Sequence, residues 1–191
     1  NNIVSGNICQ KNISYGIRLI KSDNNTVSSN TYVENSQDGD NTYEGIFLNI
    51  SDYNHISNNT CRKADVATTL TGAHGAGETA IVLASTTGFW AGGGITFDPG
   101  GGSEETDKIA SIEDATHLTL TAGLTNPQIN GEEVIVPRTK YGITITGTCD
   151  HNMIHGNNLY QSGQTGDLND GGTNTHKRDN LSNAGAWLAD V

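Results

Sequence analysis

The sequence predicts an all-β fold in which a solenoid of short stacked strands is interrupted by a separate β-rich segment. Three observations lead to this prediction. Segments with one residue pattern recur along the chain, asparagine is frequent in those segments and rare between residues 65 and 139, and this middle part alternates apolar and polar residues between glycines. Recurrent short segments are typical of solenoids, and alternation with a period of two is typical of strands.

The first element to justify is the repeat. Three stretches align, and a half-copy precedes them: GIRLIKSDNNTVSSNTYV from Gly16, GIFLNISDYNHISNNTC from Gly45, GITITGTCDHNMIHGNNL from Gly142 and NIVSGNIC from Asn2. In register, one column is apolar and another is asparagine: Val4, Val27, Ile56 and Ile154, then Asn7, Asn30, Asn59 and Asn157. Stacked coils produce such columns, because neighbouring strands repeat at about 4.8 Å.

The asparagine spacing gives the number of coils. Asn2 and Asn25 are 23 residues apart, which suits one coil. Asn25 and Asn54 are 29 apart, so this coil contains a longer loop, most easily within ENSQDGDNTYE. Asn54 and Asn152 are 98 apart, and subtracting one coil of 23 leaves 75 residues outside the solenoid. We therefore expect about four coils and one long insertion.

Stacking also fixes the direction of individual side chains. Inward asparagines at the turns are expected to bond their amides to the copies above and below, so Asn59 is one rung of a ladder while Asn58 points outward. Cys9 and Cys61 share a column with Tyr32 between them, which separates them by two rungs, about 9.6 Å. A disulfide needs Cα atoms within roughly 7 Å, so we expect free cysteines.

The second element is the insertion, residues 65–139. GETAIVLASTTGFWAGGGITFDPGGG, SEETDKIASIED, HLTLTAGL and GEEVIV predict several short antiparallel strands in a compact β-barrel or sandwich. Both ends return to adjacent coils, at Ala64 and Lys140, as insertions into a host loop do. We expect the insert to be removable without unfolding the solenoid.

The pattern G-I-x-L-x-x-S-x-x-N-x-I-x-x-N resembles the right-handed parallel β-helix family, which is pectin-lyase-like and includes NosD-type β-helix repeats. The resemblance covers residues 1–64 and 141–180 and implies a right-handed parallel β-helix in two pieces, 1–64 and 140–191, around the insert 65–139. The insert resembles the small β-modules of phage tail and surface proteins. Such motifs specify architecture and say little about chemistry.

Charge and composition narrow the partners. The net charge is −11 with 10 Lys and Arg residues, which argues against nucleic acid because phosphate neutralisation needs clustered cations. No run of about 18 apolar residues occurs, so we expect no membrane span. An acidic surface rich in asparagine, threonine and glycine is common in extracellular and virion proteins. We therefore expect an extracellular, cell-surface or virion location.

Two sets of residues are candidates for a catalytic or ligand-binding site. Asp23, Asp52 and Asp150 share one turn column, and outward carboxylates on a β-helix can hold Ca²⁺ or act in acid–base catalysis. Arg18 lies on the neighbouring strand as a further catalytic candidate, and Phe47 and Tyr53 are candidates for ligand binding. Aspartate is also a favoured turn residue, and the sequence favours that structural role.

Metal binding has two candidate sites. The loop DGDNTYE places Asp38, Asp40 and Glu44 close in sequence, which makes a Ca²⁺ site possible although the full EF-hand pattern is missing. His55 and His155 face outward on neighbouring coils, but no third ligand is evident from the sequence. Copper delivery, as in NosD-type proteins, calls for clusters of His, Met and Cys, and one methionine and buried cysteines argue against it.

These features favour a non-catalytic surface or fibre module that binds a glycan or a surface protein. The alternative is a lyase or hydrolase acting on an acidic polysaccharide, and the scarcity of cations weighs against it. The first coil begins without a cap, so we expect it to be covered by a longer chain or by another subunit in a homo-oligomer. At the other end Leu181, Ala184, Trp187 and Leu188 have roughly helical spacing and are expected to cover the last coil.

Overall fold

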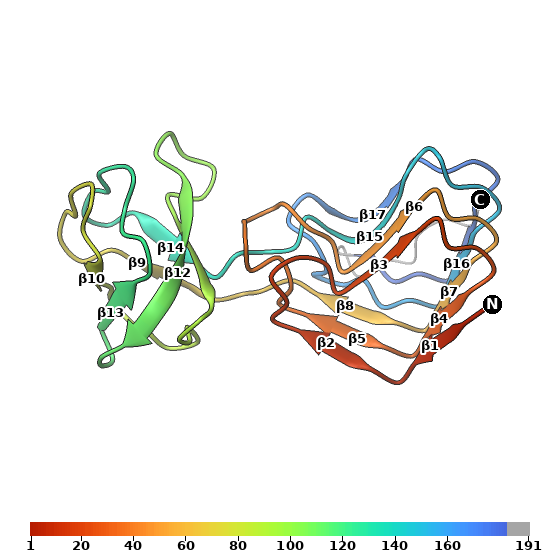
Figure 1. The fold of residues 1–191 in the computed structure, drawn as a ribbon, viewed down its shortest axis with the longest axis horizontal. Coiled ribbons are helices and arrows are strands. Elements are labelled where there is room, and N and C mark those ends of the chain that lie inside the picture. The colour runs from red at the N-terminus through yellow and green to blue at the C-terminus, as the bar shows by residue number, and fades with distance from the viewer. Residues whose placement is uncertain (183–191) are drawn as a thin grey trace. The chain divides into compact units, whose positions relative to one another are not determined.

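The computed structural model describes residues 1–182, which form two compact units. The first unit consists of residues 1–36 and 41–63 and the chain from Arg138 onward, and the second consists of residues 37–40 and 64–137. All named elements in the described part of the chain are β-strands (Figure 1). The all-β prediction is therefore confirmed.

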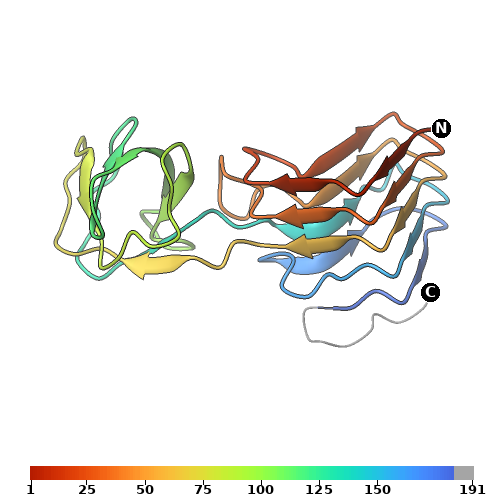
Figure 2. The same ribbon diagram turned by 90° about the horizontal axis from the view of Figure 1, so that it is seen from below.

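The first unit is a parallel β-helix with three sheets. Sheet I contains β1 (Ile3–Ser5), β4 (Thr26–Ser28), β7 (His55–Ser57), β16 (Met153–His155) and β18 (His176–Arg178). Sheet II contains β2 (Ile8–Gln10), β5 (Thr31–Val33) and β8 (Thr60–Arg62). Sheet III contains β3 (Ile17–Ile20), β6 (Ile46–Asn49), β15 (Tyr141–Ile145) and β17 (Gly166–Asp170). Figure 2 shows the coils stacked one on another.

The strand register follows the columns expected from the sequence. In sheet I the pairs Val4↔Val27, Val27↔Ile56 and Ile56↔Ile154 are all parallel. These side chains point inward and join Ile46, Leu48, Ile143 and Ile145 of sheet III in one buried apolar cluster. The prediction of a right-handed parallel β-helix of about four coils is confirmed.

Asparagine ladders run along the solenoid at its turns. One of them joins side-chain amides of successive coils through Asn7, Asn30, Asn59, Asn157 and Asn180, at 2.9–3.1 Å. The last four of these residues are almost completely buried. Each amide also bonds backbone groups, as when Asn59 Nδ2 donates to the Val27 carbonyl at 2.9 Å. The ladders thus satisfy backbone polar groups that the turns would leave unpaired.

Asn58 is exposed, as expected, but its backbone decides what may replace it. Its φ is +54°, and the equivalent turn position in the other coils also has a positive φ: Gly6, Ser29, Gly156 and Asp179. Asparagine and glycine adopt this left-handed conformation more readily than other residues. An alanine at position 58 is therefore strained, and glycine is the neutral replacement.

The glycine that opens each repeat has a packing reason. A Cβ at Gly16 would lie 2.6 Å from the Gly45 carbonyl oxygen, and one at Gly45 would lie 2.7 Å from that of Gly142. Adjacent coils approach too closely there for any side chain. Glycine in this column is thus required by contact between coils rather than by turn conformation.

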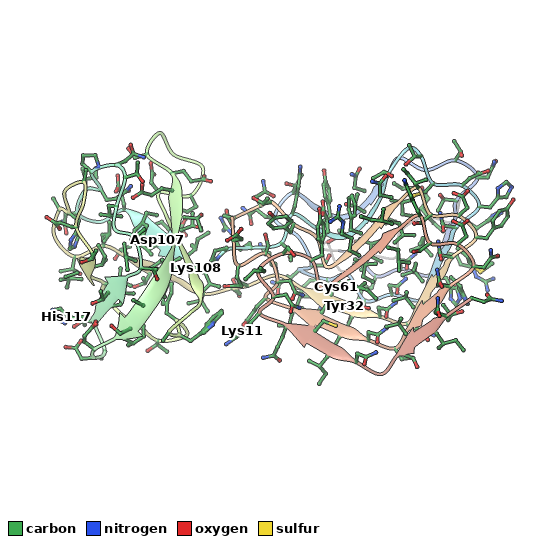
Figure 3. All side chains as sticks on the ribbon, in the orientation of Figure 1. Lys11, Tyr32, Cys61, Asp107, Lys108 and His117 are labelled. Atoms are coloured by element: carbon green, nitrogen blue, oxygen red, sulfur yellow. The ribbon has the colours of Figure 1, made fainter. Side chains whose placement is uncertain are left out.

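The cysteines are free, as predicted. Cys9 and Cys61 each pair with Tyr32, one on either side, so two strand spacings separate them. Figure 3 labels Tyr32 and Cys61, which lie on β5 and β8. Burial raises the pKa of the Cys61 thiol well above its ordinary value and also raises that of Cys9.

The second unit is a six-stranded antiparallel sheet. Its order is β10 (Ala80–Val82), β13 (His117–Leu120), β12 (Glu105–Ile112), β11 (Gly94–Phe97), β14 (Glu133–Ile135) and β9 (Ala67–Thr69). An antiparallel bridge between Leu70 and Leu83 joins the first and last strands, with Thr71 N–H donating to the Val82 carbonyl at 2.9 Å. The sheet therefore closes into a barrel, which decides between the two architectures expected from the sequence.

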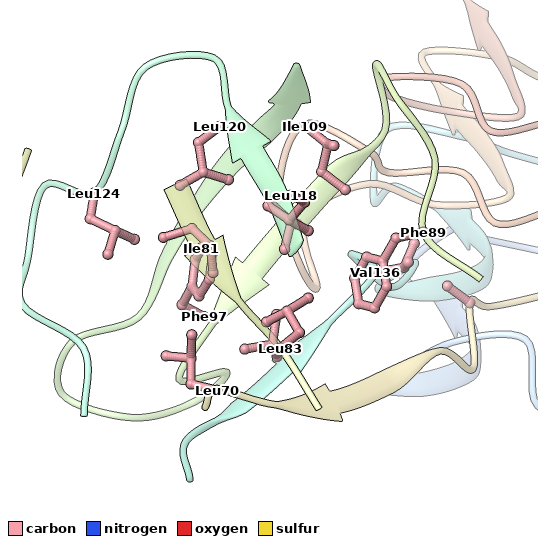
Figure 4. Packing of buried hydrophobic residues seen from close by; sticks show 13 residues of the cluster. Leu70, Ile81, Leu83, Phe89, Phe97, Ile109, Leu118, Leu120, Leu124 and Val136 are labelled. Carbon is pink, nitrogen blue, oxygen red and sulfur yellow. The ribbon is translucent and has the colours of Figure 1, made fainter. Parts of the chain in front are cut away.

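The barrel has an apolar core of its own. Its buried side chains include Leu70, Ile81, Leu83, Phe97, Ile109, Leu118, Leu120 and Val136 (Figure 4). Residues 37–40, from the long loop of the second coil, also belong to this unit: Gln37 Oε1 accepts a hydrogen bond from Gly94 N–H at 3.2 Å. Nothing in the residue pattern of this loop predicts that association.

The two ends of the solenoid differ in how far their apolar residues are covered within the described part of the chain. Ile3 and Ile8 of the first coil are 77% and 72% exposed. At the other end Leu181 forms a parallel bridge with Asn158 and so continues the line of sheet II. The expected helical tail beyond it, with Ala184, Trp187 and Leu188, lies outside the described residues.

Candidate functional site

The strongest candidate site is an aromatic platform on the outer face of sheet III. Residues alternate along these strands, so Ile46 and Leu48 of β6 point inward while Phe47 points outward. The Phe47 ring lies 4.9 Å from that of Tyr15, and Tyr15 makes an edge contact with Tyr43 at 5.1 Å. All three rings are half-buried. We define the aromatic platform as Tyr15, Tyr43 and Phe47.

Arg18 borders the aromatic platform, and Lys140 is next to it, since its backbone N–H donates to the Tyr43 carbonyl at 2.7 Å. The Arg18 guanidinium lies 5.2 Å from the centre of the Tyr15 ring and 5.8 Å from that of Phe47. Arg18 is exposed and forms no ion pair with a carboxylate of the described residues. Lys140 Nζ lies 6.0 Å from the Tyr141 ring. A guanidinium held against aromatic rings keeps its N–H groups available for a planar anionic group such as a carboxylate.

Glu44 is a nearly buried carboxyl group beside the aromatic platform. It is 6% exposed, and Thr144 Oγ1 donates to its Oε1 at 3.5 Å. Burial raises the pKa of Glu44, and the Lys140 ammonium and the Thr144 hydrogen bond only partly oppose this. Burial, followed by the Glu44 charge, also raises the pKa of Tyr15. Glu44 is thus a carboxyl group that takes up a proton more readily than usual.

The carboxylates of the aspartate column, Asp23, Asp52 and Asp150, are engaged in structural hydrogen bonds. Asp23 Oδ1 accepts the Asp52 N–H at 2.8 Å, and Asp52 Oδ1 accepts the Asp150 N–H at 2.7 Å. Asp150 in turn accepts from Thr173 Oγ1 and Asn174 Nδ2. Burial works to raise the pKa of Asp150, but these hydrogen bonds and the contact with His151 outweigh it and lower the pKa. Asp23 and Asp52 thus each accept a backbone hydrogen bond from the next coil, and Asp150 accepts side-chain hydrogen bonds from the coil that follows it.

Tyr53 and Arg18, both named as site candidates from the sequence, lie in different places. The Tyr53 ring stacks on His151 at 5.0 Å and an interplanar angle of 12°, at the turn between sheets III and I. Arg18 instead joins Phe47 and the aromatic platform. The structure therefore brings Arg18 and Phe47 together and leaves Tyr53 apart from them.

The three acidic residues proposed for Ca²⁺ do not form a cluster. Asp38 is paired with Lys108 at 3.4 Å, within the unit that also contains Asp40, and Figure 3 labels Lys108 on β12. Glu44 belongs to the solenoid and contacts Thr144. Across residues 1–182, no group of three or more His, Cys, Asp or Glu side chains is placed to hold a metal ion.

The barrel has a shallow pocket of about 300 Å³ along β10 and β13. Its charged residues serve the β12–β13 turn: Asp114 Oδ1 accepts the N–H groups of Thr116 and His117 at 2.7 and 2.8 Å. These hydrogen bonds and that of the His117 ring hold the pKa of Asp114 far below its usual range. Its polar groups are already satisfied within the turn, so the pocket is a weaker candidate than the aromatic platform.

A family model described as "Periplasmic copper-binding protein (NosD)" matches residues 1–83, less than half of the 191 residues. The resemblance to NosD-type β-helix repeats is therefore confirmed for that part. The comparison with curated proteins gave no match.

Among solved structures, the chain is similar to two phage tailspikes. The gp54 tailspike of Acinetobacter baumannii bacteriophage AP22, in complex with A. baumannii capsular saccharide, matches with TM-score 0.35 and 10% identity over 82% of this chain and 30% of that one. The tailspike protein gp49 from Pseudomonas phage LKA1 matches with TM-score 0.36 and 16% identity over 79% of this chain and 26% of that one. The chain thus spans less than a third of each.

The fold and the candidate site together describe the kind of domain that this chain forms. The chain is a right-handed parallel β-helix interrupted by a closed β-barrel, with an aromatic and cationic patch on one outer sheet. Within residues 1–182 no helix has the length and apolar character needed to cross a membrane.

Proposed function

We propose that this chain is a non-catalytic glycan-binding module of an extracellular, cell-surface or virion protein, and that the glycan lies on the aromatic platform. The observation that carries the proposal is the group of half-buried rings, Tyr15, Tyr43 and Phe47, with the Arg18 guanidinium held over two of them. A sugar ring has apolar C–H faces and a polar rim. Aromatic side chains suit the faces, and neighbouring polar groups suit the rim.

The cations indicate which sugars fit best. Arg18 forms no ion pair with a described carboxylate, and a guanidinium can bind a carboxylate through two parallel hydrogen bonds. We therefore expect a saccharide with a carboxylate group, such as a uronic acid unit. The net charge of −11 disfavours long polyanions in general, so recognition is expected to involve a short segment of the glycan.

A glycan array and titration with the best ligand test this proposal. Phe47→Ala and Tyr15→Ala should each weaken binding at least tenfold, about 1.4 kcal/mol, while leaving the melting temperature of the solenoid near that of the wild type. Tyr53→Ala is the matched control, because Tyr53 is 57% exposed but stacks on His151. Equal loss of binding in all three variants, or no loss in any of them, would reject the aromatic platform as the binding site.

Arg18→Gln tests the preference for carboxylates separately. It should reduce binding of a carboxylated saccharide much more than binding of its carboxyl-reduced form. Equal effects on both forms would show that Arg18 supports the rings and does not recognise the anion.

One observation favours a second function, a lyase or hydrolase acting on an acidic polysaccharide. Glu44 lies near Tyr15 with a raised pKa, as an acid–base catalyst needs, and Lys140 is close to it. Incubation with acidic polysaccharides, followed by measurement of reducing ends and of new double bonds, tests this function. Activity lost in Glu44→Gln with binding retained would establish the enzyme, and intact substrate would favour the binding module.

The homo-oligomer expected from the sequence also belongs to the proposal. The exposed apolar residues Ile3 and Ile8 of the first coil support it. Light scattering of the chain at micromolar concentration gives the oligomeric state, and a stable monomer would contradict self-association of this chain.

A further inference from the structure

Two imidazoles meet on the outer face of sheet I, away from the aromatic platform of sheet III, and a thioether stands beside one of them in the strand register. His55 of β7 and His155 of β16 come from neighbouring coils, 100 residues apart in sequence. Their Nε2 atoms lie 2.5 Å apart, and their ring centres lie 4.6 Å apart. Both imidazoles therefore direct a nitrogen toward one point in space.

Met153 lies next to both histidines. In the register of sheet I it pairs directly with His55, and it precedes His155 by two residues on the same strand, hence on the same face. Its side chain is 42% exposed, and it is the single methionine of the chain. An unbranched thioether on an outer sheet face, beside two imidazoles, adds a soft donor to the pair.

His176 extends the same arrangement into the next coil. It pairs with Met153 from the opposite side and is exposed. His55 and His176 thus flank Met153 on the two neighbouring strands, and both are diagonal neighbours of His155. Within the described residues no three His, Cys, Asp or Glu side chains form a metal-binding group, so the ring of His176 lies outside the pair as it stands.

The chemistry of the pair suits a transition-metal ion. Neutral imidazole is a common ligand of Zn²⁺, Ni²⁺ and Cu²⁺. Two nitrogens on one tetrahedral ion, each about 2.0–2.1 Å from it, lie roughly 3.4 Å apart, so a small opening of the pair admits the ion.

We propose that His55 and His155 bind a first-row transition-metal ion on the outer face of sheet I, with Met153 beside them as a third donor and water or an external ligand in the remaining position. The site joins two adjacent coils. A bound ion therefore stabilises the folded solenoid, because the unfolded chain holds the two histidines 100 residues apart.

Zn²⁺ titration of the intact chain by calorimetry, at pH 7.5, tests the histidine pair. We expect one ion per chain and a melting temperature that rises with Zn²⁺ and returns on chelation. His55→Ala and His155→Ala should each weaken Zn²⁺ binding at least tenfold and abolish that rise. His151→Ala is the control, because His151 pairs with Asp150 and stacks on Tyr53.

Two results would overturn the proposal. One is a wild-type chain that binds Zn²⁺ no more tightly than the double variant lacking His55 and His155. The other is a loss in His151→Ala as large as in the two pair variants. Melting curves without metal show whether each variant is folded, and His→Gln at the same positions serves where an alanine variant does not fold.

The role of the thioether is tested with a soft ion that undergoes no redox change, Ag⁺, in a Cys9→Ser background, because the half-buried free thiol of Cys9 would otherwise bind that ion. Met153→Leu should weaken Ag⁺ binding severalfold and leave Zn²⁺ binding within about twofold, because thioethers prefer soft ions. Unchanged Ag⁺ affinity in Met153→Leu would remove Met153 from the donor set.

Discussion

Replacing Asn59 by alanine removes one rung from the middle of the longest asparagine ladder. The Asn59 side chain is fully buried and takes part in four hydrogen bonds. Its oxygen accepts from Asn30 N–H at 3.0 Å and Asn30 Nδ2 at 3.1 Å, and its amide donates to the Val27 carbonyl at 2.9 Å and to Asn157 Oδ1 at 3.0 Å. All four are lost together in the variant.

The cost depends on which partners keep another bond. Asn30 Nδ2 still donates to the Val4 carbonyl, and Asn157 Oδ1 still accepts from Asn59 N–H. The Asn30 N–H loses the acceptor that it has in the structure. One buried donor without a partner costs about 1–3 kcal/mol and a net hydrogen bond is worth about 0.5–1.5 kcal/mol, so we expect a total of about 2–4 kcal/mol.

Urea denaturation followed by far-ultraviolet circular dichroism measures this loss as a change in the free energy of unfolding. The transition of the solenoid should move and that of the barrel should not. Asn58→Gly is the matched control, since Asn58 is exposed and glycine tolerates its φ of +54°, and its change should stay within about 0.5 kcal/mol. Equal changes in the two variants would refute the ladder argument.

Three further predictions follow from the same structure. Joining Ala64 to Lys140 through a short glycine linker should leave a solenoid that melts cooperatively. The isolated barrel should also fold, because it has an apolar core of its own. An unfolded solenoid after the deletion would show that solenoid and barrel depend on each other for folding. The raised pKa of Glu44 means that ionisation of its carboxyl group destabilises the folded state. In urea titrations across pH, Glu44→Gln should therefore be as stable as the wild type below about pH 4.5 and more stable than it as pH rises through the folded pKa. A stability difference that shrinks with rising pH would contradict the burial argument. Cys61 and Cys149, both buried, should resist thiol reagents in the native chain and react in urea, as followed by mass spectrometry, and rapid native labelling of Cys61 would contradict its inward position.

The candidate site could be predicted from the sequence only in part. Arg18 and Phe47 fall within the aligned repeats, where the alternation of strand residues assigns them to the outer face. Tyr15 and Tyr43 were missed because they precede the repeat glycines and lie outside the strands. A signal was nevertheless present in the sequence. Extending the repeat alignment by one residue before its glycines adds a column that contains Tyr15, Glu44 and Tyr141.

The sequence by itself determined the repeat, its inward columns, the asparagine ladders and the free cysteines. Each of these follows from stacking at a fixed spacing, and that spacing places residue i of one coil over its equivalent in the next without further information. Only the tertiary structure decided what depends on the path of the chain between strands. The bridge between Leu70 and Leu83 closes the barrel, and the long loop of the second coil gives Gln37 to the barrel. The approach of His55 to His155 also depends on the chain path, since their two coils become neighbours only after the insertion. The two residues are diagonal neighbours on adjacent strands, and such side chains touch only when their rotamers direct them toward each other.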